Sequence, residues 1–369
     1  MSDIEIGRGK RARRAYNFDD IAIVPTRRTR DPHDVSTNWT IDAYQFDIPV
    51  LAAPMDSVVS PATAIAMGKL GGVGVLNLEG VWTRYDEPEK LLAEIRSLPA
   101  EQATARMQQI YAEPIKAELI KARLAEVRAA GVTVAAALSP QRTQQFYETV
   151  TGAGVDLFVI RGTTVSAEHV GSSHEPLNLK KFIYELDVPV IVGGAATHRS
   201  AIHLMRTGAA GVLVGFGGGA ASTTRSTLGI HVPMATAVSD VAGARRDYMD
   251  ESGGRYVHVI ADGGLGTAGD VVKAIACGAD AVMLGAVLAR ATDAPGAGWH
   301  WGSEAHHEEL PRGHRVNVGQ VAPLEQMLFG PASVADGTAN IIGALRRSMA
   351  TTGYSDLKEF QRVEVAVVS

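Results

Sequence analysis

One glycine-rich stretch carries the residue types that could surround a ligand and react with it. "VGFGGGAASTTR", from Val214 to Arg225, has four glycines in five residues, followed by small hydroxyl side chains. Glycine has no Cβ, so a ligand can approach its backbone closely. Ser222 and Thr224 are the side chains of this stretch with chemical potential. We therefore expect a loop that cradles a ligand and presents a hydroxyl group to it.

A second set of residues combines a carboxylate with open backbone N–H groups. "VIADGG" places Asp262 directly before Gly263 and Gly264, and "VMLGA" supplies Gly285. A carboxylate can accept two hydrogen bonds from a ribose diol, whereas glycine N–H groups and a helix N-terminus bind an anion. The pattern predicts a nucleoside monophosphate site. The alternative is that Asp262 caps the next helix and the glycines form tight turns.

The elements that must position these residues are short, apolar and rich in β-branched residues. None alternates cleanly between apolar and polar residues, so they predict parallel strands that are buried on both faces. Eight such strands alternating with helical patterns predict an α/β protein of the (β/α)8 TIM barrel type, whose active site lies at the C-terminal ends of the strands. A doubly wound open sheet is the alternative. The eight segments begin at Pro49, Gly72, Val132, Asp156, Pro189, Ala210, Tyr256 and Asp280.

Two long intervals interrupt this alternation within a predicted single barrel domain over residues 1–369. Residues 78–131 are polar and contain a strong amphipathic pattern, which predicts a helical insertion. Residues 293–340 follow the eighth strand and are rich in Gly, Pro, His and Trp. A connection of this length is uncommon unless it has a function. We therefore expect residues 293–319 to form a mobile lid over the barrel mouth.

Composition argues against several other classes of protein. The formal net charge of -5 does not indicate a nucleic-acid partner. The sequence has neither a signal-peptide pattern nor a run of about 18 apolar residues, so we expect a cytoplasmic protein with no membrane contact. The single cysteine, Cys277, is expected in the core. The adjacent His306 and His307 do not share a helical face and do not indicate a metal centre.

The glycine loop also matches the glycine spacing of a Rossmann dinucleotide fingerprint, as "GFGGGA". That fingerprint requires an early strand–helix unit in which a helix opens directly after the glycines. Here the glycines follow the sixth predicted strand and lead into "STTRSTLGIHVP", which is a poor helix former. We therefore do not interpret the loop as a Rossmann motif.

Several longer segments resemble the IMP dehydrogenase and GMP reductase family. They are "YNFDDIAIVP", "PVLAAPMDSV", "VIADGGLGTAGDVVKAIACGADAVMLGAVLA" and "GPASVADGTANIIGALRRSMATTGYSDLKEF". The resemblance covers nearly the whole chain except residues 78–131, an interval too short for the CBS regulatory pair that most IMP dehydrogenases insert there. It implies a homotetrameric or octameric barrel of the short branch. Its implied ligands are a purine nucleoside monophosphate (IMP, GMP or XMP) and a nicotinamide cofactor, NAD(P)(H).

The resemblance also assigns roles to individual positions. Asp262 would hold the ribose hydroxyls, while the backbone of Gly263, Gly264 and Gly285 would hold the phosphate. Arg161 stands where the family has an acid that meets the cofactor ribose. The remaining implied site residues are Met55, which would pack on the purine, Gly302 in the substrate site, Gln320 at the purine edge, and Gly217 and Gly219, whose carbonyl groups would hold potassium.

This sequence departs from the family where the chemistry matters most. Ser222 occupies the place of the catalytic cysteine, whereas Thr224 is retained in the place of the general acid. A thiol ionises readily, but a serine hydroxyl needs a strong base beside it, and the sequence offers none. Ala220 and Ala286 replace the serines that contact the phosphate.

The lid of this sequence lacks the arginine–tyrosine pair of the dehydrogenases, and its length resembles the reductase flap. We therefore expect a purine-nucleotide oxidoreductase that favours GMP reduction. Two alternatives stay open. The chain is a catalytically silent nucleotide-binding relative with a structural or regulatory role, or Ser222 is an engineered replacement of a natural cysteine.

Overall fold

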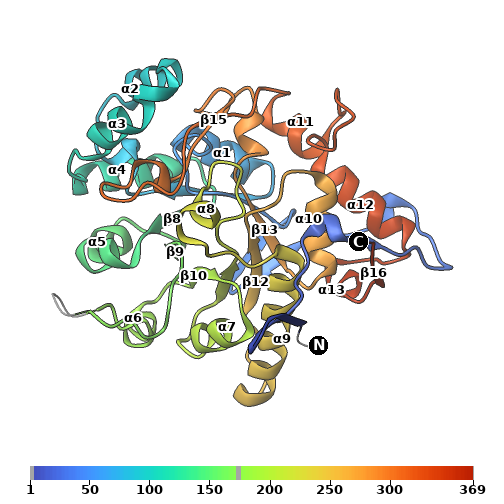
Figure 1. Cartoon of the computed structure of the whole chain (residues 1–369). Helices are drawn as coiled ribbons and strands as arrows, with labels where there is room; N and C mark the ends of the chain where they lie inside the picture. Colours follow the sequence, from blue (N-terminus) through green and yellow to red (C-terminus); the bar gives the residue numbers. More distant parts are fainter. Residues whose placement is uncertain (1–3, 172–175, 369) are drawn as a thin grey trace.

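Eight parallel strands close into a barrel at the centre of the computed structural model, which describes residues 4–171 and 176–368 (Figure 1). Each strand pairs with the next along the chain, and the last pairs with the first. The predicted TIM barrel is confirmed, and the open-sheet alternative is wrong. The strands are β6 (Val50–Ala52), β7 (Val73–Asn77), β8 (Ala135–Leu138), β9 (Leu157–Arg161), β10 (Val190–Ala195), β11 (Gly211–Val214), β12 (His258–Asp262) and β13 (Ala281–Leu284).

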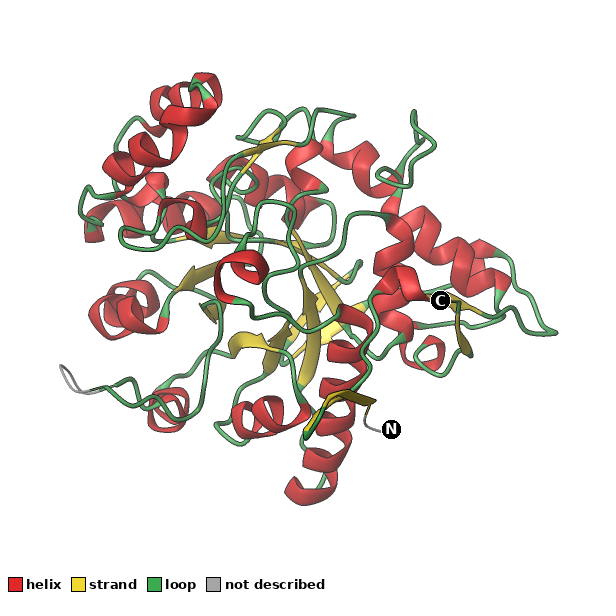
Figure 2. Ribbon diagram, in the orientation of Figure 1, coloured by secondary structure: helices red, strands yellow, loops and turns green. Residues whose placement is uncertain are grey.

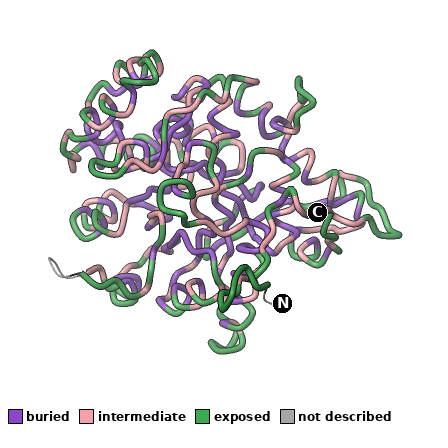
Figure 3. The backbone as a smooth tube through the Cα atoms, viewed as in Figure 1, coloured by how far each residue is buried: buried purple, intermediate pink, exposed green. Residues whose placement is uncertain are grey.

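A ring of helices covers the outside of the barrel, so the strands are buried on both faces (Figures 2 and 3). The helix starts follow the local sequence. Ser60 accepts a hydrogen bond from the backbone N–H of Thr63 and caps α1 (Pro61–Lys69). The ring helices are α1 (Pro61–Lys69), α4 (Ala117–Ala129), α5 (Pro140–Gly152), α6 (Leu179–Glu185), α7 (His198–Met205), α9 (Met234–Ser252), α10 (Ala268–Ala276) and α12 (Ile341–Thr351).

The interval 78–131 divides into two parts. Helix α4 packs between α1 and α5, so it belongs to the ring. The additional part consists of η3 (Val81–Thr83), α2 (Pro88–Ser97) and α3 (Ala100–Tyr111). Figure 1 shows α2 and α3 projecting outward beside the lid. We call residues 88–111 the α2–α3 hairpin.

The segment predicted as a lid contains regular structure. Strands β14 (Trp299–His300) and β15 (Val316–Asn317) pair antiparallel, and η5 (Ser303–His306) lies between them. Strands of two residues leave no periodic signal in a sequence, which is why the pairing of β14 with β15 was not predicted. The mobility of the lid stays a prediction.

The remaining elements come from the two ends of the chain. The C-terminal β16 (Val365–Val367) pairs antiparallel with the N-terminal β3 (Ile21–Ile23). Within the described parts of the chain, no helix combines the length and apolar character that crossing a membrane requires. The other elements are β1 (Ile4–Gly7), β2 (Lys10–Ala12), η1 (Phe18–Asp20), η2 (Pro32–Asp34), β4 (Trp39–Ile41), β5 (Tyr44–Phe46), α8 (Thr224–Leu228), η4 (Leu288–Arg290), α11 (Leu324–Phe329) and α13 (Leu357–Phe360).

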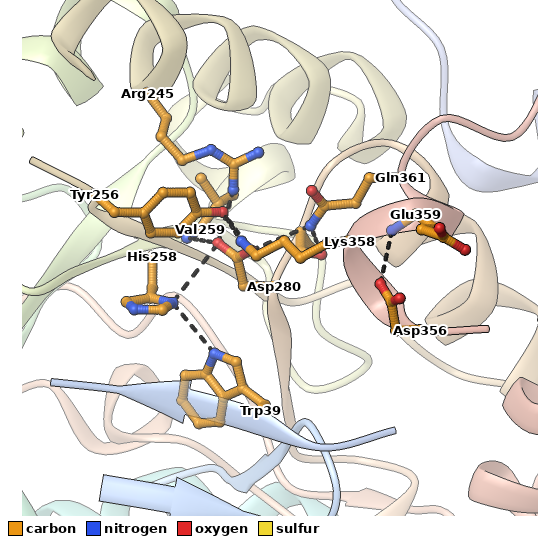
Figure 4. A network of polar contacts seen from close by, with 11 residues as sticks. Trp39, Arg245, Tyr256, His258, Val259, Asp280, Asp356, Lys358, Glu359 and Gln361 are labelled. Atoms are coloured by element: carbon orange, nitrogen blue, oxygen red, sulfur yellow. Dashed lines mark hydrogen bonds and ion pairs between the residues drawn. The ribbon is translucent and has the colours of Figure 1, made fainter. Parts of the chain in front are cut away.

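A buried carboxylate ties the C-terminal segment to the N-terminal end of the barrel (Figure 4). Asp280, directly before β13, accepts hydrogen bonds from Arg245 at 2.7 Å, Tyr256 at 2.7 Å and Lys358 at 2.6 Å. His258, the first residue of β12, lies beside this group and accepts a hydrogen bond from the indole of Trp39 at 3.3 Å. The arrangement neutralises a buried negative charge with two cations, as burial of charge requires.

Candidate active site

A cavity of about 340 Å³ lies at the C-terminal ends of the barrel strands. Its size falls in the range of small-molecule sites. Residues that follow β6, β9, β11, β12 and β13 line it, together with lid residues. The structure brings together almost all of the sequence-predicted site residues: Met55, Arg161, Gly217, Gly219, Ser222, Thr224, Asp262, Gly263, Gly264, Gly285 and Gly302.

Gln320 is the predicted site residue that the structure places outside this cavity. Its side chain is exposed, and its amide lies 3.4 Å from the carbonyl oxygen of Thr292 at the base of the lid. The contact of Gln320 with a purine edge stays a prediction. The resemblance fixed its spacing from "GPAS" but not the path of the short lid.

Arg161 and Asp262 form an ion pair inside the cavity. Arg161 ends β9 and Asp262 ends β12, and the guanidinium Nε lies 3.0 Å from the carboxylate Oδ2. Burial by itself lowers the pKa of Arg161, but the carboxylates of Asp262 and Glu304 outweigh it and raise that pKa. The pair uses one oxygen of Asp262. A carboxylate offers about four acceptor positions, so the other oxygen can still accept from a ribose diol.

The packing of the two loops against each other requires several of their glycines. Gly263 and Gly264 adopt φ values of +103° and +70°, which side chains rarely allow. A Cβ on Gly218 would lie 3.3 Å from the backbone nitrogen of Gly264, and one on Gly215 would collide with the carbonyl oxygen of Asp262. The backbone that lies closely against the glycine loop is therefore that of the neighbouring loop after β12. Asp262 does not cap α10, because Thr267 does.

Ser222 has a hydroxyl partner and no base. Its Oγ lies 3.2 Å from the Oγ1 of Thr224 and accepts from the Thr224 backbone N–H at 3.3 Å. Among the described residues, neither a carboxylate nor an imidazole is hydrogen-bonded to this hydroxyl. Thr224 opens α8, a five-residue helix. The stretch "STTRSTLGIHVP", predicted to be a poor helix former, therefore contains one short helix.

The lid is joined to the loop that carries Ser222. The backbone N–H of Thr223 donates to the carbonyl of Arg312 at 2.7 Å, and that of His314 donates to Ala221 at 2.9 Å. An isolated antiparallel bridge pairs Ser222 with Gly313. The position of the loop therefore depends on the position of the lid.

Arg315 joins the same part of the lid to the α2–α3 hairpin. Its guanidinium donates to the carbonyl groups of Ile95, Arg96 and Leu98 at the end of α2. It also stacks on the ring of Trp299, 4.0 Å from the ring centroid. Together with the hydrogen bonds between the lid and the Ser222 loop, these contacts connect the α2–α3 hairpin to Ser222 through the lid.

His300 and Glu304 also line the cavity, and sequence reasoning missed both. Burial, followed by the nearby charge of Arg161, lowers the pKa of His300 to about 4. Both residues lie in "WHWGSE", where polar residues are interrupted by tryptophans. That alternation was the available signal, but nothing in the spacing connected it to the barrel mouth.

The described residues contain no cluster of three or more His, Cys, Asp or Glu side chains arranged for a metal. His306 stacks instead on the ring of Tyr111, with the centroids 3.5 Å apart. The carbonyl of Gly219, one of the predicted potassium ligands, already accepts from the N–H of Ser222 at 3.0 Å. A carbonyl has a second lone pair, so this bond leaves room for a cation.

A closed parallel barrel with a polar, glycine-lined cavity at its C-terminal face defines the class of (β/α)8 barrel enzymes. Comparison with known proteins specifies the family. The model of the IMP dehydrogenase / GMP reductase domain matches residues 15–308. The chain therefore belongs to the IMP dehydrogenase/GMP reductase family, which is a family of oxidoreductases.

Several proteins are similar to this chain over nearly its whole length. An uncharacterised oxidoreductase of Mycolicibacterium smegmatis is 53% identical, covering 99% of this chain and 100% of that protein. The inosine-5'-monophosphate dehydrogenase of Methanocaldococcus jannaschii is 26% identical, covering 95% of this chain and 92% of that protein. A crystal structure of an IMP dehydrogenase/GMP reductase-like protein from Corynebacterium glutamicum superposes with a TM-score of 0.95 at 48% identity, covering 99% of this chain and 98% of that one.

Proposed function

We propose that this chain binds a purine nucleoside monophosphate at the barrel mouth and acts on it as an NAD(P)(H)-dependent oxidoreductase, with GMP reduction as the favoured direction. The observation that carries the proposal is the convergence of Asp262, Gly263, Gly264 and Gly285 on one cavity. The free oxygen of Asp262 suits a ribose diol, and the glycine loops suit a phosphate. Family membership supports the purine and the nicotinamide cofactor.

The side of the cavity proposed for the cofactor carries Arg161, Gly162 and Thr163. The cofactor would supply or accept a hydride at the purine. The unused N–H groups of Arg161 and the hydroxyl of Thr163 are the polar groups available to hold it there. Thr163 already accepts from the lid residue Arg312 at 3.2 Å, so the lid position affects this side too.

Ser222 favours a second candidate function. A hydroxyl whose partner is Thr224 lacks a base to ionise it. The second candidate is a nucleotide-binding protein without turnover, with a structural or regulatory role.

Two measurements test these candidates. Calorimetric titration with IMP, XMP and GMP tests binding, and NADPH absorbance with GMP tests turnover. Binding with turnover supports the oxidoreductase, binding without turnover supports the silent relative, and absence of binding excludes both.

The family also suggests the assembly and the cation. We propose a homotetramer or octamer in the cytoplasm, with potassium held by the carbonyl groups of Gly217 and Gly219. Light scattering measures the number of subunits in the assembly. Repeating it with and without potassium chloride detects an effect of potassium on that number.

A further inference from the structure

The Gly285 end of the cavity contains an imidazole. His300, on the lid strand β14, lines the cavity although only 2% of its surface is exposed. A Cβ placed on Gly285 would lie 3.4 Å from the His300 Cε1 and 3.6 Å from its Nε2. Ala220 and Ala286 line the same cavity and offer no hydroxyl group. His300 is therefore the polar side chain nearest the glycine proposed to bind phosphate.

Hydrogen bonds on the far side of the ring determine which nitrogen carries the proton. The Nδ1 of His300 lies 3.1 Å from the Oγ of Ser57. Ser57 also accepts from the backbone N–H of Trp301 at 3.3 Å and donates to the carbonyl of Trp301 at 3.2 Å. We assign the single hydroxyl proton of Ser57 to the Trp301 carbonyl, which makes Nδ1 the donor to Ser57. The neutral ring then presents an unprotonated Nε2 to the cavity, where the described residues provide no partner.

We propose that His300 is the phosphate-binding side chain of this site, and that it takes up a proton as the nucleotide binds. This inference rests on the proposed function. A lone pair on Nε2 repels a phosphate oxygen, whereas a protonated Nε2 donates a charge-assisted hydrogen bond to it. Before binding, neither the Nε2 of His300 nor the phosphate dianion carries a proton. In the complex, one proton lies between Nε2 and a phosphate oxygen.

The charges around His300 agree with this behaviour. Burial, followed by the charge of Arg161, which also lines the cavity, lowers the pKa of His300 and disfavours its protonation in the free protein. The other ionisable groups lining the cavity are Asp262, Asp270 and Glu304. A phosphate dianion adds negative charge beside the ring and reverses the balance. Since the complex holds one proton more than the free partners, affinity must fall as pH rises.

The experiment compares a nucleotide with its nucleoside. GMP and guanosine are titrated into the wild-type protein between about pH 6.5 and about pH 8.5, above the phosphate pKa of about 6. Buffers of different ionisation enthalpy report the protons taken up. We expect proton uptake with GMP and an affinity loss approaching about tenfold per pH unit. Guanosine reaches Asp262 but carries no phosphate, so its binding should show neither effect.

Variants separate charge from shape. His300→Gln keeps an N–H donor that does not titrate, so the pH dependence of GMP binding should disappear. His300→Leu removes the donor and should weaken GMP binding at about pH 6.5 by about tenfold or more, while guanosine binding is unchanged. Glu304→Gln is the control for another titrating group and should retain the proton uptake.

The outcomes distinguish the two proposals. If GMP, IMP and XMP all fail to bind the wild-type protein, the proposed function fails and this inference falls with it. If they bind without proton uptake, or equally well to His300→Leu, the phosphate role of His300 is overturned and nucleotide binding stands. Where the variants do not fold, the wild-type comparison of GMP with guanosine decides the question.

Discussion

Arg161 and Asp262 end barrel strands that are separated by two others, yet their side chains meet across the barrel mouth with Nε 3.0 Å from Oδ2. Both side chains are mostly buried, at 17% and 10% exposure. The pair holds the carboxylate in one orientation and makes Arg161 depend on it for charge compensation. We therefore expect ligand binding and stability to be linked at this position.

Replacing Asp262 tests that link. Asp262→Ala should weaken purine-nucleotide binding by at least about tenfold, because a hydrogen bond to a charged group contributes about 1.5–3 kcal/mol. It should also lower the free energy of unfolding, since Arg161 is left as an unpaired, buried cation. Calorimetry and urea unfolding measure the two effects. The double variant Asp262→Ala/Arg161→Met should recover stability but not affinity; unchanged affinity in Asp262→Ala would remove this carboxylate from the site.

Restoring a thiol tests the role of the glycine loop. Ser222→Cys should raise GMP reduction or IMP oxidation by orders of magnitude, because a thiolate is accessible where a serine alkoxide is not. The gain should be larger in the reductive direction, since the lid lacks the arginine–tyrosine pair of the dehydrogenases. NAD(P)H absorbance follows both directions, with Ser222→Ala as the inactive control. Equal turnover by the serine and cysteine forms would show that another residue performs the chemistry.

The contacts of Arg315 predict that the loop carrying Ser222 becomes more mobile when this arginine is replaced. Arg315→Gln should detach the lid from α2 and increase amide hydrogen exchange in residues 299–319 and in residues 219–224. Arg123→Gln is a matched control, because Arg123 also donates to backbone carbonyls and lies over an indole, that of Trp82 at 5.9 Å. Its carbonyl partners, however, are in residues 82–86. Equal exchange in both variants would argue against the link.

The Asp280 cluster predicts a large effect on stability. Asp280→Asn leaves Arg245 and Lys358 without their shared carboxylate and should cost about 3–5 kcal/mol of unfolding free energy. Glu251→Gln breaks the exposed pair of Glu251 with Arg206, whose side chains are 45% and 44% exposed, so it should lower the free energy of unfolding far less than Asp280→Asn does. Urea unfolding of both variants measures the contrast. Similar losses would mean that the buried cluster contributes no more than a surface pair.

His258 predicts how stability changes with pH. Burial lowers its pKa to about 4, against an ordinary value of about 6.5. Above about pH 6.5 the ring is neutral in both states, whereas between about 6.5 and about 4 the unfolded chain binds a proton that the folded chain does not. The free energy of unfolding should therefore fall by up to about 3 kcal/mol as the pH falls from about 6.5 to about 4.

Unfolding at about pH 7.5 and about pH 5 detects the change. His258→Gln keeps an acceptor for Trp39 and should reduce the pH dependence. Replacing the exposed His33 with glutamine should leave it as in the wild type. An undiminished slope in His258→Gln would assign the effect to other groups, such as His300 and His306, whose pKa values are also lowered by burial.

The barrel was predictable because its signal is local. Each strand is a short apolar segment, as in the fully buried β8, and each is followed by a turn and a helix pattern. Asp262 and the glycines were found for a related reason, since strand ends share one face in a barrel. The order of the strands then placed Gly285 beside them without further information.

Contacts between distant residues were not predictable. Arg161 and Asp262 are 101 residues apart, and nothing local in the sequence indicates that the arginine pairs with this carboxylate. His300 depends on the path of the lid, whose strands are two residues long. The position of Gln320 outside the cavity was not predictable for the same reason, because spacing along the chain does not fix the course of an irregular connection.

The Asp280 cluster has a consequence for synthesis on the ribosome. Its carboxylate lies before the eighth barrel strand, but Lys358 and Gln361 follow Asp280 by 78 and 81 residues and are therefore made later. The nascent polypeptide can therefore pair all eight strands while this buried charge still lacks one of its cations. We expect the barrel to reach its full stability only after the segment that carries Lys358 and Gln361 has been made and has docked. A chain stalled before that segment would expose the incompletely neutralised N-terminal end of the barrel to chaperones and proteases.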